Sequence, residues 1–159
     1  MRARILLPTN EPLMLGFLQT NLSRFTNALR KDARIHTEGR YLVVEIQPVQ
    51  KWEILVGLEL LTQLDEVYLR AHPQTPLLYK AQVSYQLEPP GVEDWLTTPV
   101  LYQRGIGDCE DLACALCAER RVRGFECNPH VEKHGHVWHI TARAGELIED
   151  PSRVLGMGR

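Results

Sequence analysis

The spacing of apolar residues changes over the first third of this chain, from a helical repeat to extended runs. Over residues 12–29 apolar side chains recur every three or four positions, which predicts an amphipathic helix. A short apolar run at 3–7 precedes it, and two runs rich in β-branched and aromatic residues follow within 34–46, separated by a turn at Gly39. The pattern therefore predicts the α+β fold class, beginning with a βαββ module over residues 1–48.

A second amphipathic pattern over residues 52–69 predicts another helix, which must end before Pro73. Residues 73–99 contain five prolines, so we expect an ordered but largely irregular segment that wraps the core. This segment belongs to a second domain, predicted over residues 49–159.

The last third of the chain predicts a helix followed by short strands. The helix starts at Asp108, a residue that caps helices well, and ends at Gly124, a residue that favours the left-handed conformation after a helix. Three strand candidates follow, at residues 125–132, 136–143 and 146–149.

Composition narrows the class of protein. With 159 residues, 44% hydrophobic and 24% charged, the chain can bury a core, and its net charge of −2 disfavours nucleic-acid binding. No apolar run approaches the ~20 residues of a membrane span, and Pro8 interrupts the start too early for a secretion signal. We therefore expect no membrane partner and reduced thiols at the four cysteines, Cys109, Cys114, Cys117 and Cys127.

Cys109 has the setting of a nucleophile. It falls in the first turn of the predicted helix, where unpaired N–H groups and the helix dipole favour a thiolate. Its acidic neighbours, among them Glu110, raise the thiol pKa, so a cationic partner is needed. His136 can supply it, and Asp150 can orient that imidazole by accepting a hydrogen bond from its second nitrogen.

Two other histidines, His134 and His139, are rivals to His136 for this role. By alternation along the predicted strand, His134 shares a face with His136, whereas His139 points away. Other groups could complete the site. The Cys109 backbone amide is one donor for an oxyanion hole, and Trp138 and Trp95 could line a substrate cleft, although core packing explains both tryptophans as well.

The chain resembles the transglutaminase-like superfamily, in particular its bacterial and phage cysteine-peptidase branch. Three motifs carry the resemblance, which covers residues 73–157: Gly107-Asp108-Cys109-Glu110-Asp111-Leu112-Ala113, His136-Val137-Trp138 and Asp150-Pro151-Ser152. It implies a papain-like core, with the cysteine at the start of a helix packed on an antiparallel sheet that carries the histidine and the aspartate. It also implies Gln103 as a candidate oxyanion donor, because papain-like peptidases hold their oxyanion glutamine six residues before the cysteine. The Pro-Leu-Leu-Tyr segment at 76–79 is also similar to small proteins of tailed-phage structural gene clusters.

Two functions follow from the resemblance. One is a cysteine hydrolase without a cofactor, acting on a peptide or isopeptide substrate through a thioester, in the host cytoplasm or the virion. The other is a virion structural or adaptor protein that docks on other virion proteins through the 1–48 module. The sequence does not identify the substrate, and it does not distinguish a peptidase from a transamidase.

Zinc binding is the main alternative to the interpretation of a cysteine as a nucleophile. Cys114 and Cys117 are followed by Cys127 and His130 at a spacing that approximates a four-ligand site. The first pair falls mid-helix among apolar residues, where cysteine serves as a small apolar side chain. We therefore expect no metal.

Overall fold

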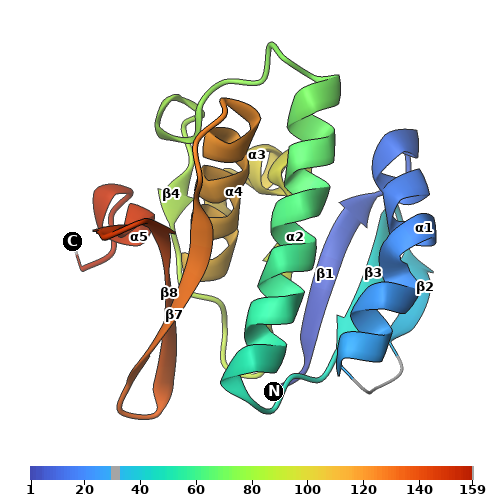
Figure 1. Ribbon diagram of the computed structural model, residues 1–159, viewed down its shortest axis with the longest axis horizontal. Helices are drawn as coiled ribbons and strands as arrows, with labels where there is room; N and C mark the ends of the chain where they lie inside the picture. Colours follow the sequence, from blue (N-terminus) through green and yellow to red (C-terminus); the bar gives the residue numbers. More distant parts are fainter. Residues whose placement is uncertain (30–32, 159) are drawn as a thin grey trace.

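The βαββ module predicted for the start of the chain is present in the computed structural model, which describes residues 1–29 and 33–158. Strand β1 (Ala3–Pro8) leads into helix α1 (Pro12–Leu29), and β2 (Arg34–Glu38) and β3 (Tyr41–Ile46) form the predicted hairpin. β3 also pairs antiparallel with β1, so the module forms a small sheet. Figure 1 shows α1 lying across this sheet.

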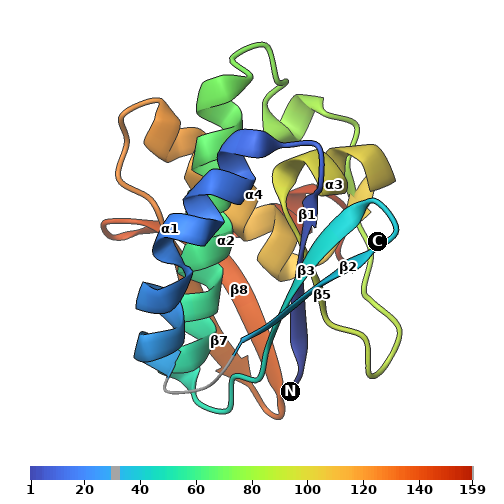
Figure 2. The same ribbon diagram turned by 90° about the vertical axis from the view of Figure 1, so that its right-hand side faces the viewer.

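The second part of the chain completes this sheet. Strand β5 (Asp94–Leu96) pairs parallel with β1, giving the order β2-β3-β1-β5. Helix α2 (Lys51–Ala71) lies beside α1, and both cover one face of the sheet (Figure 2). Buried side chains of both parts meet there, including Ile5, Met14, Leu58 and Trp95. Residues 1–48 and 49–159 therefore share one sheet and one core.

The proline-rich segment is irregular over much of its length, but it holds more regular structure than its composition predicts. It contains the 3₁₀ turn η1 (Leu78–Lys80), the two-residue strand β4 (Ser84–Tyr85) and β5. Helix α3 (Thr98–Arg104) starts at its end, and β4 pairs parallel with β6 (Ile106–Gly107). These short elements bring the segment alongside the start of the next helix.

That helix, α4 (Cys109–Val122), is the predicted one, and it is central to the fold. Residues 110–118 are all buried, as expected of a helix covered on every side. It packs against α2 and against the sheet formed by β7 (Asn128–His134), β8 (Val137–Ala144) and β9 (Leu147–Glu149), after which comes the short α5 (Pro151–Val154) (Figure 1). The fold is thus mixed α+β. Among the described helices, none has the length and apolar character needed to cross a membrane.

Two glycines provide a matched test of how tightly α2 packs on the sheet. A Cβ atom at Gly57 lies 2.6 Å from Ile46 Cδ1 and 2.7 Å from Trp95 Cζ3, whereas a Cβ at Gly16 of α1 meets nothing within 4 Å. Gly57→Ala should therefore lower the free energy of unfolding by about 1–3 kcal/mol through overpacking. Gly16→Ala should raise it by about 0.5–1 kcal/mol, because alanine favours a helix over glycine. Urea unfolding measures both, and changes of the same sign would contradict this packing.

Candidate functional site

Cys109 is the first residue of α4, as the sequence predicted. Asp108 is the N-cap and forms a capping box with Asp111. Gly107 precedes the cap because a side chain there would clash: its Cβ would lie 2.5 Å from Leu101 Cδ1 and 2.9 Å from Asp111 Oδ2. The close approach of β6 to α3 and α4 therefore requires a glycine directly before the cap.

The thiol of Cys109 is held in its neutral form. It is half-buried, and its Sγ donates to Glu110 Oε2 at 3.2 Å. Burial and the negative charges of Glu110 and Asp108 raise the pKa of the thiol far above its ordinary range, although the backbone N–H of Ile140 donates to the sulfur and lowers it. In this arrangement the sulfur is not a nucleophile until a base takes its proton.

Asp111 ties the start of α4 to the first sheet. Its Oδ1 accepts from the Leu96 N–H at 2.6 Å, and its Oδ2 accepts from the Asp108 N–H at 3.2 Å. The side chain is fully buried, and burial together with Glu110 raises its pKa well above the ordinary value. Asp111 therefore fixes where Cys109 lies relative to β5.

A cavity of about 550 Å³ opens beside the thiol. Cys109 lines it together with both tryptophans that the sequence suggested for a cleft, Trp95 and Trp138. Trp95 is also 2% exposed and part of the core, so it serves both roles that the sequence left open. The same cavity is lined by three acidic side chains, Glu93, Asp108 and Glu110.

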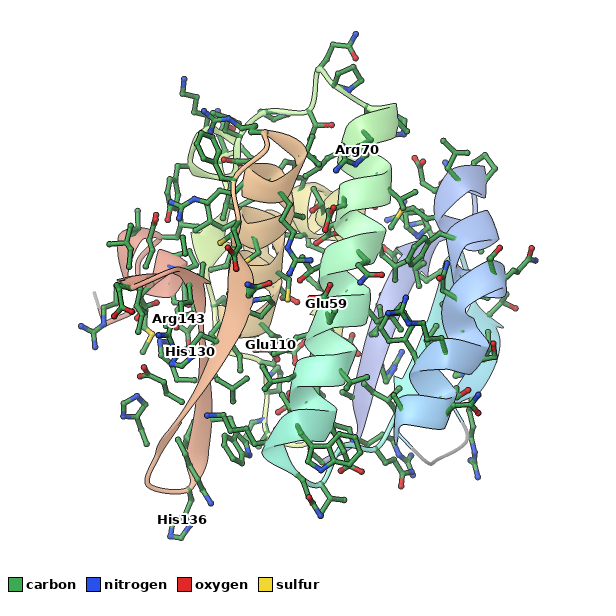
Figure 3. The ribbon with its side chains drawn as sticks, viewed as in Figure 1. Glu59, Arg70, Glu110, His130, His136 and Arg143 are labelled. Carbon is green, nitrogen blue, oxygen red and sulfur yellow. The ribbon has the colours of Figure 1, made fainter. Side chains whose placement is uncertain are left out.

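His136 lies elsewhere than the sequence predicted. It is in the exposed turn that joins β7 to β8, after Gly135 with a φ of 64°, and not on a strand. It lines the outer part of the cavity, but Figure 3 shows it at the tip of the hairpin, well away from Glu110, the neighbour of Cys109. Its imidazole is therefore not next to the thiol.

The imidazole that Asp150 contacts belongs to His139. Its Nε2 lies 2.9 Å from Asp150 Oδ2, and the two side chains are only 14% and 17% exposed. Asp150 is held in turn as the N-cap of α5, where its Oδ1 accepts from the Ser152 and Arg153 N–H groups. This preorganised pair takes the place that the sequence analysis gave to His136 and Asp150.

The structure also differs from the prediction of which histidines share a face of the hairpin. The rings of His134 and His139 are 6.1 Å apart, on the same side of the β7–β8 hairpin. The alternation argument was wrong because it ran a single strand through the turn at Gly135 and His136. Starting the strand at Val137 and noting that a tight turn links β8 to β9 would have brought His139 toward Asp150.

The backbone of His139 lies close to the thiol of Cys109. The N–H that donates to Cys109 Sγ is that of Ile140, the next residue in β8. Two covalent bonds separate this nitrogen from the Cα of His139, so that Cα lies within roughly 6 Å of the sulfur. The thiol therefore lies beside the backbone of the residue that carries the imidazole.

Gln103 does not reach the cavity. It is exposed on α3, and its amide lies against the Arg40 guanidinium. It is absent from the residues that line the space around Cys109. The oxyanion role proposed for it is therefore not supported by its position, whereas the Cys109 backbone N–H stays at the start of α4.

The cysteines and histidine of the alternative zinc site point in different directions. Cys114 Sγ contacts the Leu58 carbonyl at 3.5 Å, Cys117 and Cys127 lie with their sulfurs 3.2 Å apart, and His130 contacts Glu132. Within residues 1–29 and 33–158 no group of three or more ligating side chains could hold a metal ion. All four cysteines are free thiols.

The geometry thus brings together a capped helix start, a protonated thiol, a histidine–aspartate pair and an acidic, tryptophan-lined cavity. Sequence reasoning weighed His139 but placed it on the wrong face, and it missed Glu93 and the role of Glu110 as the hydrogen-bond acceptor of the thiol. Comparisons of the chain with family models, with curated proteins and with solved structures found no match.

Proposed function

We propose that the protein is a cysteine hydrolase of the transglutaminase-like, papain-like type, which cleaves a peptide or isopeptide bond through a thioester on Cys109. His139 is the general base and acid, and Asp150 orients it. One observation carries the proposal: a mostly buried histidine and aspartate are 2.9 Å apart, one residue along the strand from the backbone N–H that contacts the thiol.

The contact with Asp150 indicates which nitrogen of His139 carries the proton. Nε2–H donates to the carboxylate, so Nδ1 is the basic nitrogen. Cys109 must turn from Glu110 toward Nδ1, which takes the thiol proton as the sulfur attacks the carbonyl carbon. The Cys109 N–H can donate to the oxyanion. Nδ1–H then protonates the leaving amine, and water attacks the thioester, releasing the acid and the free thiol.

Reactivity of the thiol tests the assignment of the histidine. His139→Ala should slow alkylation of Cys109 by iodoacetamide at pH 7 about tenfold, since the thiolate loses its cationic partner. His136→Ala, the matched control, should stay within about twofold of the wild type. Peptide mapping by mass spectrometry distinguishes Cys109 from the three buried cysteines. A slower alkylation of Cys109 in His136→Ala, with no change in His139→Ala, would show that His136 is the partner of the thiol.

A second function is favoured by the raised pKa of the Cys109 thiol. A protein that keeps this fold as a virion structural or adaptor component needs no thiolate, and the acidic neighbours of the cysteine suit an inert thiol. Its docking surface on other virion proteins would be the 1–48 part, where β2 forms an outer strand of the first sheet. Slow alkylation of Cys109 that is equal in wild type, His139→Ala and His136→Ala would favour this function over the hydrolase.

A further inference from the structure

Three carboxyl groups line one cavity, two of them almost fully buried. Asp108 and Glu110 are 5% and 6% exposed, and Glu93 lies beside them. Burial, followed by the charges of Glu110 and Glu88, raises the pKa of Glu93 to about 7. The other ionisable groups of the lining, besides Cys109, are the Met1 amino group and the exposed side chains of Arg2 and His136, so the carboxyl groups are the buried charges of this cavity and the cations are at its exposed edge.

One of these carboxyl groups has an unused acceptor. Asp108 Oδ1 is buried and has no hydrogen-bond partner among the described residues. A buried acceptor without a donor lowers stability, so an arrangement that keeps one is expected to serve a ligand. The Asp108 side chain lines the cavity next to Cys109, and a ligand that enters the cavity with an N–H group can satisfy it.

The remaining walls suit a cation. Trp95 and Trp138 line the same space, and an indole ring attracts an ammonium or guanidinium group over its face. Trp138 already does so within the chain, because Lys133 Nζ lies 5.2 Å from the ring centroid. Carboxylates with indole rings form a site for an organic cation, whereas a metal ion would need a ligand cluster that the described residues do not form.

We propose that this cavity binds a cationic side chain, an ammonium or guanidinium group, carried by the substrate beside the carbonyl that Cys109 attacks. Glu110 and Glu93 supply the negative charge, Asp108 Oδ1 accepts from the cation, and the tryptophans cover its alkyl stem. The inference rests on the proposed function for the attack itself, but the cavity and its charge do not depend on turnover.

Binding to a non-reactive protein tests the cavity alone. In the Cys109→Ser variant, Nα-acetyl-lysine methylamide should bind about tenfold more tightly by calorimetry than Nα-acetyl-norleucine methylamide, a neutral analogue of similar shape. Glu93→Gln in the same background should reduce this preference at least threefold. Glu146→Gln, which removes one charge from the exposed turn after β8, is the matched control and should leave it unchanged.

The outcomes separate the two proposals. Equal binding of the lysine and norleucine compounds, or a preference that Glu93→Gln leaves intact, overturns the cation site while the hydrolase stays open. Binding of Mg²⁺ or Ca²⁺ that displaces the lysine compound also overturns it. A clear lysine preference together with a Cys109 alkylation rate that does not depend on His139 keeps the cation site and rejects the hydrolase.

Discussion

Raising the pH from 5 to 7 should lower the free energy of unfolding by at least about 3 kcal/mol. Asp65 of α2 is fully buried; its Oδ1 accepts from the Thr98 N–H at 2.5 Å, while its Oδ2 has no partner among the described residues. Burial raises its pKa from 3.8 to about 8. The folded chain therefore holds a proton that the unfolded chain releases, which costs about 1.4 kcal/mol of stability per pH unit between those values.

The sign follows from the direction of the shift. The stability due to protonated Asp65 is present in full below pH 3.8 and is lost as the pH rises toward about 8. Asp111, whose pKa is raised mainly by burial, acts in the same direction. Glu88 and Glu93, half-buried with pKa values raised to about 7, add smaller amounts because solvent screens them.

Urea unfolding at pH 5 and pH 7 measures the effect, and Asp65→Asn isolates the share that comes from Asp65. Asparagine can still accept from the Thr98 N–H but cannot ionise, so the fall between the two pH values should shrink by about 2–3 kcal/mol. Glu146→Gln, on an exposed turn, should leave the fall as in the wild type. A stability that is constant or rises over this pH range would show that Asp65 ionises normally in the folded chain.

Local patterns were sufficient to predict most of the fold. The apolar repeat predicts α1 and α2, and the Asp108 cap with Gly124 predicts α4 within a residue or two of its ends. Strand β5 could not be predicted from local patterns. It has only three residues, which carry too weak a signal, and its partner β1 lies about 90 residues earlier in the sequence. Helix α3 had a readable signal, threonine followed by Pro99 in its first turn, in a segment where proline suggested only irregular chain.

The candidate site was predictable where it depends on neighbours in sequence and not where it depends on strand geometry. The place of Cys109 and its acidic surroundings follow from one short motif. The choice between His136 and His139 depends on where the hairpin turn falls, and a shift of one residue reverses every face of a strand. Glu93 could not be linked to Cys109 from sequence because β5, which follows it directly, brings it there through pairing with β1.

The position of β8 relative to Cys109 depends on the packing of α4 between α2 and the sheet of β7, β8 and β9. One side chain of α4 contacts both α2 and this sheet. Arg121, 14% exposed, forms hydrogen-bonded ion pairs with Glu59 and Glu66 of α2 at 2.9 and 3.0 Å. It also donates to the Cys127 carbonyl at 2.6 Å and to Asn128 of β7 at 2.7 Å. These contacts satisfy much of its guanidinium group.

Arg121→Ala should therefore lower the free energy of unfolding by about 3–5 kcal/mol, because two carboxylates and a carbonyl each lose a charged donor in a partly buried place. Glu59 then keeps its contact with Gln63, and Glu66 keeps its pair with Arg70. Arg121→Lys should recover only part of the loss, since one ammonium cannot reproduce the forked contacts. Arg123→Ala is the matched control on the same stretch of chain: its side chain is 55% exposed and its pair with Glu119 is 3.9 Å long, so the change should stay below about 1 kcal/mol. Thermal and urea unfolding measure all three, and equal losses in Arg121→Ala and Arg123→Ala would show that the network adds nothing beyond a surface charge.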